Sequence, residues 1–287
     1  MVQHGHAARA VAAAAAVGLM GLATGCSAAA EADNESPAES AAAVHDAADR
    51  LVRAGSSKAR TSMEMASGGT RVTIRGEGVY DYRARVGRLK VVLPQDPSGA
   101  EEHRPITELL APGALYMKNR GAGVPSDKWV RVDTATMSDG NLVTGGATDP
   151  LAAAELLRGA RKVTYVGESE LAGTEVRHYR GTVDMAAAAR AASPAGRPAL
   201  EAAAKGFAKD QVPFDVYLDA EGRIRKVCHR FSFVNTKVTA AVKGKGKGGK
   251  REVVDVASTT LLDGFGISAN IELPDTKDIF AGKIAEN

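Results

Sequence analysis

The sequence predicts an α+β fold, in which strands follow one another in an antiparallel meander and helices are inserted as blocks. Between residues 58 and 133, apolar and polar side chains alternate with a period of two, as in strands with one buried and one solvated face. Turn-forming segments separate short apolar runs along the chain. The helical segments interrupt groups of strands, whereas parallel βαβ folds alternate single strands with helices. We expect about ten or eleven strands and three helices.

The chain begins with an apolar run at 11–23, which has the length of the apolar region of a secretory signal. A membrane-spanning helix needs roughly 20 such residues. The run leads into Ala23-Thr24-Gly25-Cys26, which resembles the lipobox of bacterial lipoproteins, with Leu22 one place earlier than usual. This resemblance implies that residues 1–25 are a signal peptide and that Cys26 is lipidated. The alternative is an ordinary signal peptide that is cut elsewhere and leaves Cys26 unmodified.

A small, acidic stretch, 26–35, is expected to be a flexible tether that begins with the lipidated cysteine. A helix begins after Ser36, because a capping serine is followed by proline and, three residues later, by glutamate. Gly55 is expected to end this helix. Asp49 and Arg53 are expected to pair across one helical turn. The apolar face of the helix consists of Val44, Ala48, Leu51 and Val52.

Four apolar runs in the first half of the chain show the strand pattern. In the first of them, residues such as Ile74 and Tyr80 alternate with charged residues. Segments rich in turn-forming residues separate the runs. The runs are 72–82, 88–93, 108–118 and 128–133, and the turn segments are 94–99, 121–127 and 138–146.

The second half of the chain begins with a short helix at Asp149-Pro150. The Ala-rich stretch 185–207 predicts a helix that is broken at 193–196, since Pro194 does not fit a helix interior. A turn at 219–222 joins two strands as a hairpin. The strand-like runs are 162–169, 174–184, 212–218, 223–234, 237–242, 253–262 and 267–273.

Composition and motifs exclude several classes of function. The net charge is +3, and five positive charges lie within 243–251, so the chain has no general basic surface of the kind that nucleic-acid binding needs. Catalytic and metal-binding motifs are absent from the sequence, and we expect neither an enzyme nor a metal or cofactor. His178 and His229 are interpreted as packed or surface strand residues. Cys228 is expected to be a buried, free thiol.

Two features leave alternatives open. The basic segment is either a solvated hairpin tip or a contact with anionic lipid heads or wall polymers. An alanine-lined helix at 185–207 leaves either an apolar cavity against the sheet or close packing without a void. The residues of the basic segment are Lys243, Lys245, Lys247, Lys250 and Arg251.

Several segments, in this order and after a lipobox, resemble a known family. They are DKWVRVD at 127–133, DPL at 149–151 with Leu156-Leu157, VGESELAG at 166–173 with HYRGTVD at 178–184, VPFDVYLDAEGR at 212–223, Phe265-Gly266 and IELP at 271–274. The family is that of the actinobacterial LppX/LprA/LprF/LprG-like lipoproteins, which are akin to the LolA and LolB lipoprotein carriers. The resemblance covers most of residues 40–275.

The resemblance implies a half β-barrel at 36–287, with helices over the concave face of a curved sheet and a lipid cavity between them. It also implies the binding and carriage of acylated lipids or glycolipids at the outer face of the cell membrane, without catalysis. Membrane lipids or glycolipids are the expected partners, and an envelope transporter or another lipoprotein is a further one. The alternative is a structural or signalling lipoprotein with no open cavity, which acts through protein partners.

The candidate cavity residues face inward if the strand registers are as expected, because a slip of one residue turns every side chain to the other face. They are Val72, Ile74, Tyr80, Val166, Phe214, Val216 and Leu218 in strands, and Leu151, Ala188 and Ala192 in helices.

Overall fold

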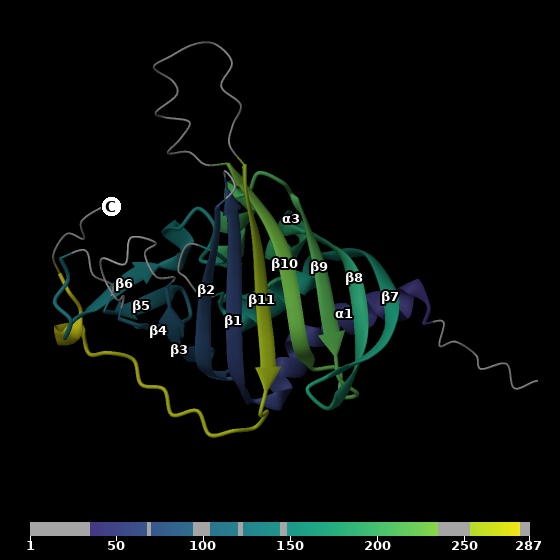
Figure 1. The fold of residues 1–287 in the computed structure, drawn as a ribbon, viewed down its shortest axis with the longest axis horizontal. Helices are drawn as coiled ribbons and strands as arrows, with labels where there is room; N and C mark the ends of the chain where they lie inside the picture. The colour runs from purple at the N-terminus through teal and green to yellow at the C-terminus, as the bar shows by residue number, and fades with distance from the viewer. Residues whose placement is uncertain are drawn as a thin grey trace, which may run out of the picture. The chain divides into compact units, whose positions relative to one another are not determined.

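The computed structural model describes residues 35–67, 70–93, 104–119, 123–143, 148–234 and 253–281. They form one open, curved antiparallel sheet of eleven strands, in the order β6-β5-β4-β3-β2-β1-β11-β10-β9-β8-β7 (Figure 1). The chain builds one wing from β1 to β6 and the other from β7 to β10, and β11 closes the gap between β10 and β1. The predicted α+β class, the half-barrel and the strand number are confirmed.

The element bounds agree with most of the predicted runs. The strands are β1 Ser56–Ser67, β2 Thr70–Asp81, β3 Val86–Val92, β4 Ile106–Ala111, β5 Ala114–Lys118, β6 Trp129–Asp133, β7 Ala160–Leu171, β8 Thr174–Asp184, β9 Gln211–Leu218, β10 Ile224–Val234 and β11 Val253–Asp263. The α-helices are α1 Pro37–Ala54, α2 Pro150–Leu156, α3 Met185–Ala191 and α4 Arg197–Gly206. Short 3-10 helices are η1 Thr134–Thr136, η2 Leu157–Gly159 and η3 Thr276–Asp278.

The helix α1 forms from local signals, as predicted. The Glu39 backbone N–H donates to the Ser36 hydroxyl at 3.3 Å, and the Ser36 backbone N–H donates to the Glu39 carboxylate at 2.9 Å. Gly55 ends the helix with a φ of 88°. The predicted pair of Asp49 with Arg53 is wrong, because Asp49 accepts two hydrogen bonds from Arg158, at 2.7 and 3.1 Å.

Two strand predictions need correction. The run 108–118 is a hairpin of β4 and β5, since Pro112 and Gly113 form a turn in which Gly113 has a φ of 70°. The run 267–273 is not a strand of the sheet. Further along, the backbone of Ile279 bridges to Trp129 and so covers part of the β6 edge. The run 237–242 lies outside the described residues.

The helices pack on the inner, concave face of the sheet, and one apolar cluster joins both layers. Figure 1 shows α1 crossing the sheet from the β7 edge towards β1. On the outer face, Asp215 accepts hydrogen bonds from His178, Arg180 and Arg230 at 2.8 to 2.9 Å. Burial alone would raise the pKa of Asp215, but these hydrogen bonds lower it to about 2. The outer face is therefore polar and the inner face apolar, as the period of two predicts.

Candidate functional site

The space between the sheet and the helices is filled by buried side chains. Ala188 and Ala192, on the inner side of the Ala-rich region, are 0% and 3% exposed. The helix α3 approaches η2 so closely that a Cβ atom on Gly159 would lie 2.5 Å from the backbone nitrogen of Ala188. Of the two interpretations of the Ala-rich stretch, close packing thus describes this structure.

The structure brings most of the candidate cavity residues together. Ile74 packs against the edge of the core, and Val72 is half-buried. The others that lie in the buried apolar cluster are Tyr80, Leu151, Ala188, Ala192, Phe214, Val216 and Leu218. The core that they share connects the inner faces of β2 and β9 with α2 and α3.

Val166 lies apart from this cluster, with 49% of its surface exposed. The inward residues of β7 are Val163, which is buried, and Tyr165, which packs against the core. Irregular pairing with β8 around residues 161–164 and 165–167 disturbs the alternation of this strand. A strict period of two therefore placed Val166 on the wrong face. Cys26, Lys243, Lys245, Lys247, Lys250 and Arg251 lie outside the described residues.

A cleft of about 60 Å³ opens between the two layers. It lies where the β2–β3 turn and the β4–β5 turn of the sheet meet α2 and the linker between α3 and α4. Its lining combines apolar and small residues, such as Leu110, Leu151 and Ala199, with polar ones. The polar residues are Tyr80, Arg85, Thr134, Asn141, Asp149 and Glu155.

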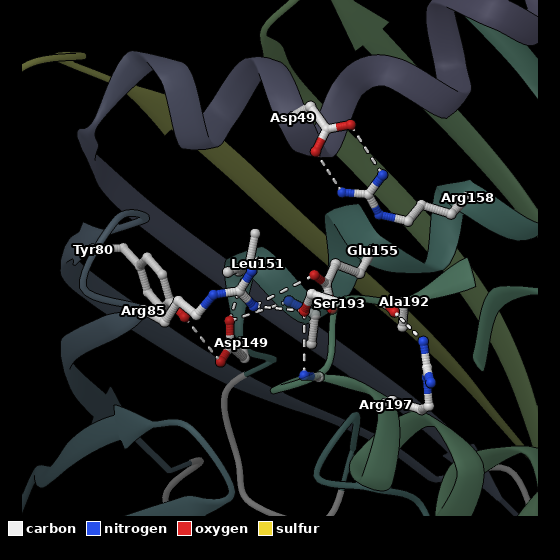
Figure 2. Close-up of polar contacts among 12 residues, drawn as sticks. Asp49, Tyr80, Arg85, Asp149, Leu151, Glu155, Arg158, Ala192, Ser193 and Arg197 are labelled. Atoms are coloured by element: carbon white, nitrogen blue, oxygen red, sulfur yellow. Dashed lines mark hydrogen bonds and ion pairs between the residues drawn. The ribbon is translucent and has the colours of Figure 1, made fainter. Parts of the chain in front are cut away.

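The guanidinium group of Arg85 links the sheet to the helices across this cleft. It stands in the β2–β3 turn with a φ of 56°, and its Nη1 atom donates to the Ser193 hydroxyl at 2.6 Å. The same atom lies 3.5 Å from Oε1 of Glu155, whose side chain is only 2% exposed. Figure 2 shows these contacts joining α2 and the α3–α4 linker to the sheet. Arg85 therefore neutralises a buried carboxylate and holds two helical segments at once.

Asp149 forms a second link between the sheet and the helices. Its carboxylate caps α2 by accepting from the backbone N–H groups of Leu151 and Ala152 at 2.7 and 3.2 Å, and the Tyr80 hydroxyl donates to it at 3.2 Å. Burial raises the pKa of Asp149 to about 6, although these three hydrogen bonds favour the charged form. Burial also raises the pKa of Tyr80 well above its usual value, so its hydroxyl stays protonated and remains a donor.

The polar side chains of the cleft bind one another and so link α2 to β2 and to the β2–β3 turn. Asp149 is engaged by a helix terminus and by Tyr80, and Glu155 faces Arg85. The described residues contain no cluster of three or more side chains suited to a metal ion. Among them, no helix is long and apolar enough to cross a membrane.

Sequence reasoning found part of this site, since the cavity candidates Tyr80 and Leu151 both line the cleft. It predicted Asp149 only as the start of a helix and Ser193 only as part of a helix break, and it did not single out Arg85 or Glu155. Arg85 and Ser193 are 108 positions apart, and Tyr80 and Asp149 are 69 apart. Such pairs become neighbours only when the helices fold onto the sheet.

Comparison with known proteins finds similarity at the level of structure. No family model matches the chain, and no curated protein matches it. The crystal structure of the lipoprotein LppX from Mycobacterium tuberculosis has a TM-score of 0.46 and 9% identity, covering 83% of this chain and 100% of that one. LprF from Mycobacterium bovis has a TM-score of 0.39 and 12% identity, with coverage of 83% and 97%. A LolA superfamily protein from Nitrosomonas europaea has a TM-score of 0.30 and 9% identity, with coverage of 83% and 96%.

Proposed function

We propose that this chain is an envelope lipoprotein, anchored through Cys26 at the outer face of the cell membrane, that binds and carries acylated lipids or glycolipids. The observation that carries the proposal is the contact between its two layers. The apolar inner face of the curved sheet packs against short helices whose inner side chains are small. At the open cleft, polar contacts such as the Arg85–Glu155 ion pair link the sheet to these helices. In this proposal the packed arrangement of helices and sheet is the closed form of the carrier.

Opening of the helices is required before an acyl chain can enter. The cleft of about 60 Å³ is far smaller than the roughly 300–1,000 Å³ of a typical small-molecule site. The helices α2, α3 and α4 have 7, 7 and 10 residues, so their stability depends on packing rather than on their own length. An acyl chain that enters replaces the contacts between alanine side chains and the sheet with its own contacts. Each methylene group that it buries contributes about 0.8 kcal/mol to the free energy of binding.

Mass spectrometry of extracted lipid tests this function. Full-chain protein is purified and its non-covalent lipid is extracted, which leaves the acyl chains of the anchor attached. We expect about one lipid for each wild-type chain and markedly less for Ala188→Phe, because Ala188 is fully buried between the layers. The matched control is Ala186→Phe, at an exposed position of the same helix, which should carry as much lipid as the wild type.

Equal loading of the Ala188→Phe protein would contradict this placement of the lipid. A wild-type protein without lipid would reject carriage altogether and favour the alternative, a structural or signalling lipoprotein that acts through protein partners. The filled interior is the observation that favours that alternative. An envelope transporter or another lipoprotein recovered with lipid-free protein after crosslinking would support it.

A further inference from the structure

The inner face of the sheet carries a stripe of polar side chains in an otherwise apolar surface. Thr61 of β1 pairs with Thr260 of β11, and Ser258 of β11 pairs with His229 of β10. These four residues, the polar stripe, are each at most 6% exposed. Successive inward positions of β11 are thus polar, between the apolar Val256 and Leu262. An inner wall that only served packing would be expected to be apolar here.

Two atoms of the polar stripe have no hydrogen-bond partner within the described part of the chain. They are Nε2 of His229 and Oγ1 of Thr260, and both residues are 1% exposed. Because buried polar groups are nearly always paired, such atoms lower stability and call for an explanation. His229 lies among aromatic rings, with ring centroids 6.4 Å from Phe214 and 5.8 Å from Phe231. Burial lowers its pKa to about 3, so the imidazole is neutral at pH 7.

The polar stripe continues towards the cleft. The hydroxyl of Ser258 lies 2.6 Å from that of Thr148, in a buried contact. Thr148 directly precedes Asp149, which lines the cleft and is bound by Tyr80. Polar side chains therefore connect the cleft, through Thr148 and Ser258, with His229.

We infer that the polar stripe is the binding site for an ester group of the lipid. Thr260 and His229, in the tautomer that carries its proton on Nε2, are the hydrogen-bond donors to the ester carbonyl oxygen. This inference rests on the proposed function and names the chemical class of the ligand. An ester fits because it accepts hydrogen bonds without bringing a charge beside Phe214 and Phe231, whereas a buried carboxylate would need a cation. A lipid without an oxygen would leave both donors unpaired.

The test compares two lipids and two variants. Full-chain protein is incubated with phosphatidylcholine vesicles that contain equal amounts of dioleoylglycerol, which has ester groups, and squalene, which is a hydrocarbon. Bound lipid is then quantified by mass spectrometry. We expect the wild type to prefer dioleoylglycerol, and His229→Phe to lower the ratio of bound dioleoylglycerol to squalene by about 3- to 10-fold, as expected for one lost hydrogen bond. Thr260→Val, which keeps the side-chain shape, should act in the same direction.

Stability without lipid separates this role from a structural one. Because an unpartnered buried polar group is removed, the thermal midpoint of lipid-free His229→Phe should rise by about 2 to 4 °C while its ester binding falls. Val227→Leu, at the next inward position of β10, is the matched control and should keep the wild-type ratio. If His229→Phe does not fold, Thr260→Val alone decides the question.

The outcomes distinguish the two proposals. A wild-type protein that takes up none of the three lipids, phosphatidylcholine included, would overturn the proposed function and this inference with it. A wild-type protein that takes up dioleoylglycerol, with the same lipid ratio in His229→Phe and Thr260→Val, would overturn only the assignment of the polar stripe. A wild type that shows no preference for the ester would do the same.

Discussion

Replacing Arg85 by methionine is expected to lower the free energy of unfolding by about 2 to 3 kcal/mol. The substitution removes the cation that faces Glu155 and the donor to Ser193, and it leaves a carboxylate buried without compensation. We place the loss below the 3–5 kcal/mol typical of broken buried pairs, since Arg85 is 28% exposed and the pair is 3.5 Å apart. Urea unfolding at pH 7.5 measures this loss.

A second substitution tests the cause. In the double variant Arg85→Met/Glu155→Met both charges are gone, and stability should return to within about 1 kcal/mol of the wild type. Arg197→Met is the matched control, because Arg197 is exposed and its side chain donates to the backbone oxygen of Ala192 at 3.3 Å. Its effect should stay within about 0.5 kcal/mol. Additive losses in the double variant would show that the pair is not the source of the effect.

The second large effect concerns pH. Asp149→Asn is expected to be more stable than the wild type at pH 7.5, by about 2 to 3 kcal/mol. Burial raises the pKa of Asp149 from 3.8 to about 6 in the folded chain, so the folded state binds the proton more tightly than the unfolded state. The resulting stabilisation is complete below pH 4 and is lost as the pH rises to 6 and above. Asparagine resembles the protonated form and still caps a helix.

Unfolding curves between pH 4 and 8 measure this difference. The stability of Asp149→Asn minus that of the wild type should be near zero at pH 4 and should grow through pH 6. Asp133→Asn, at an exposed cap that accepts from the Ala135 backbone N–H at 2.9 Å, is measured in parallel as an exposed reference. A flat difference for Asp149→Asn would mean that its carboxyl group is not perturbed by burial.

Local patterns predicted the elements that depend on local physics. The capping box at Ser36 and the glycine at 55 set the ends of α1, and Pro194 breaks the Ala-rich stretch between α3 and α4. These features rest on hydrogen bonds and backbone limits within a few residues. The hairpin at Pro112-Gly113 carried an equally local signal, but it lay within a continuous apolar run and was read as strand.

Features that depend on contacts between distant parts of the sequence were predicted less well. Phe214, Val216 and Leu218 face inward because β9 pairs with β8 without a register shift, whereas Val166 is exposed because the pairing of β7 with β8 is irregular. Asp49 bonds to Arg158 rather than to the nearer Arg53, since α1 packs against η2. In each case the deciding contact comes from another element.

By itself the sequence determined the α+β class and the helix boundaries of this protein, because the hydrophobic period and the caps act over short distances. The strand total agreed, although β1 was not among the predicted runs and the run 108–118 proved to be two strands. Only the tertiary structure decided that buried side chains fill the space between the helices and the sheet, and that Arg85 and Asp149 link the two layers at a cleft. It also placed Nε2 of His229 and Oγ1 of Thr260 in the inner wall without a partner among the described residues. Those features depend on the packing of residues far apart in the chain, whose energies are set by burial and by partners that no local pattern encodes.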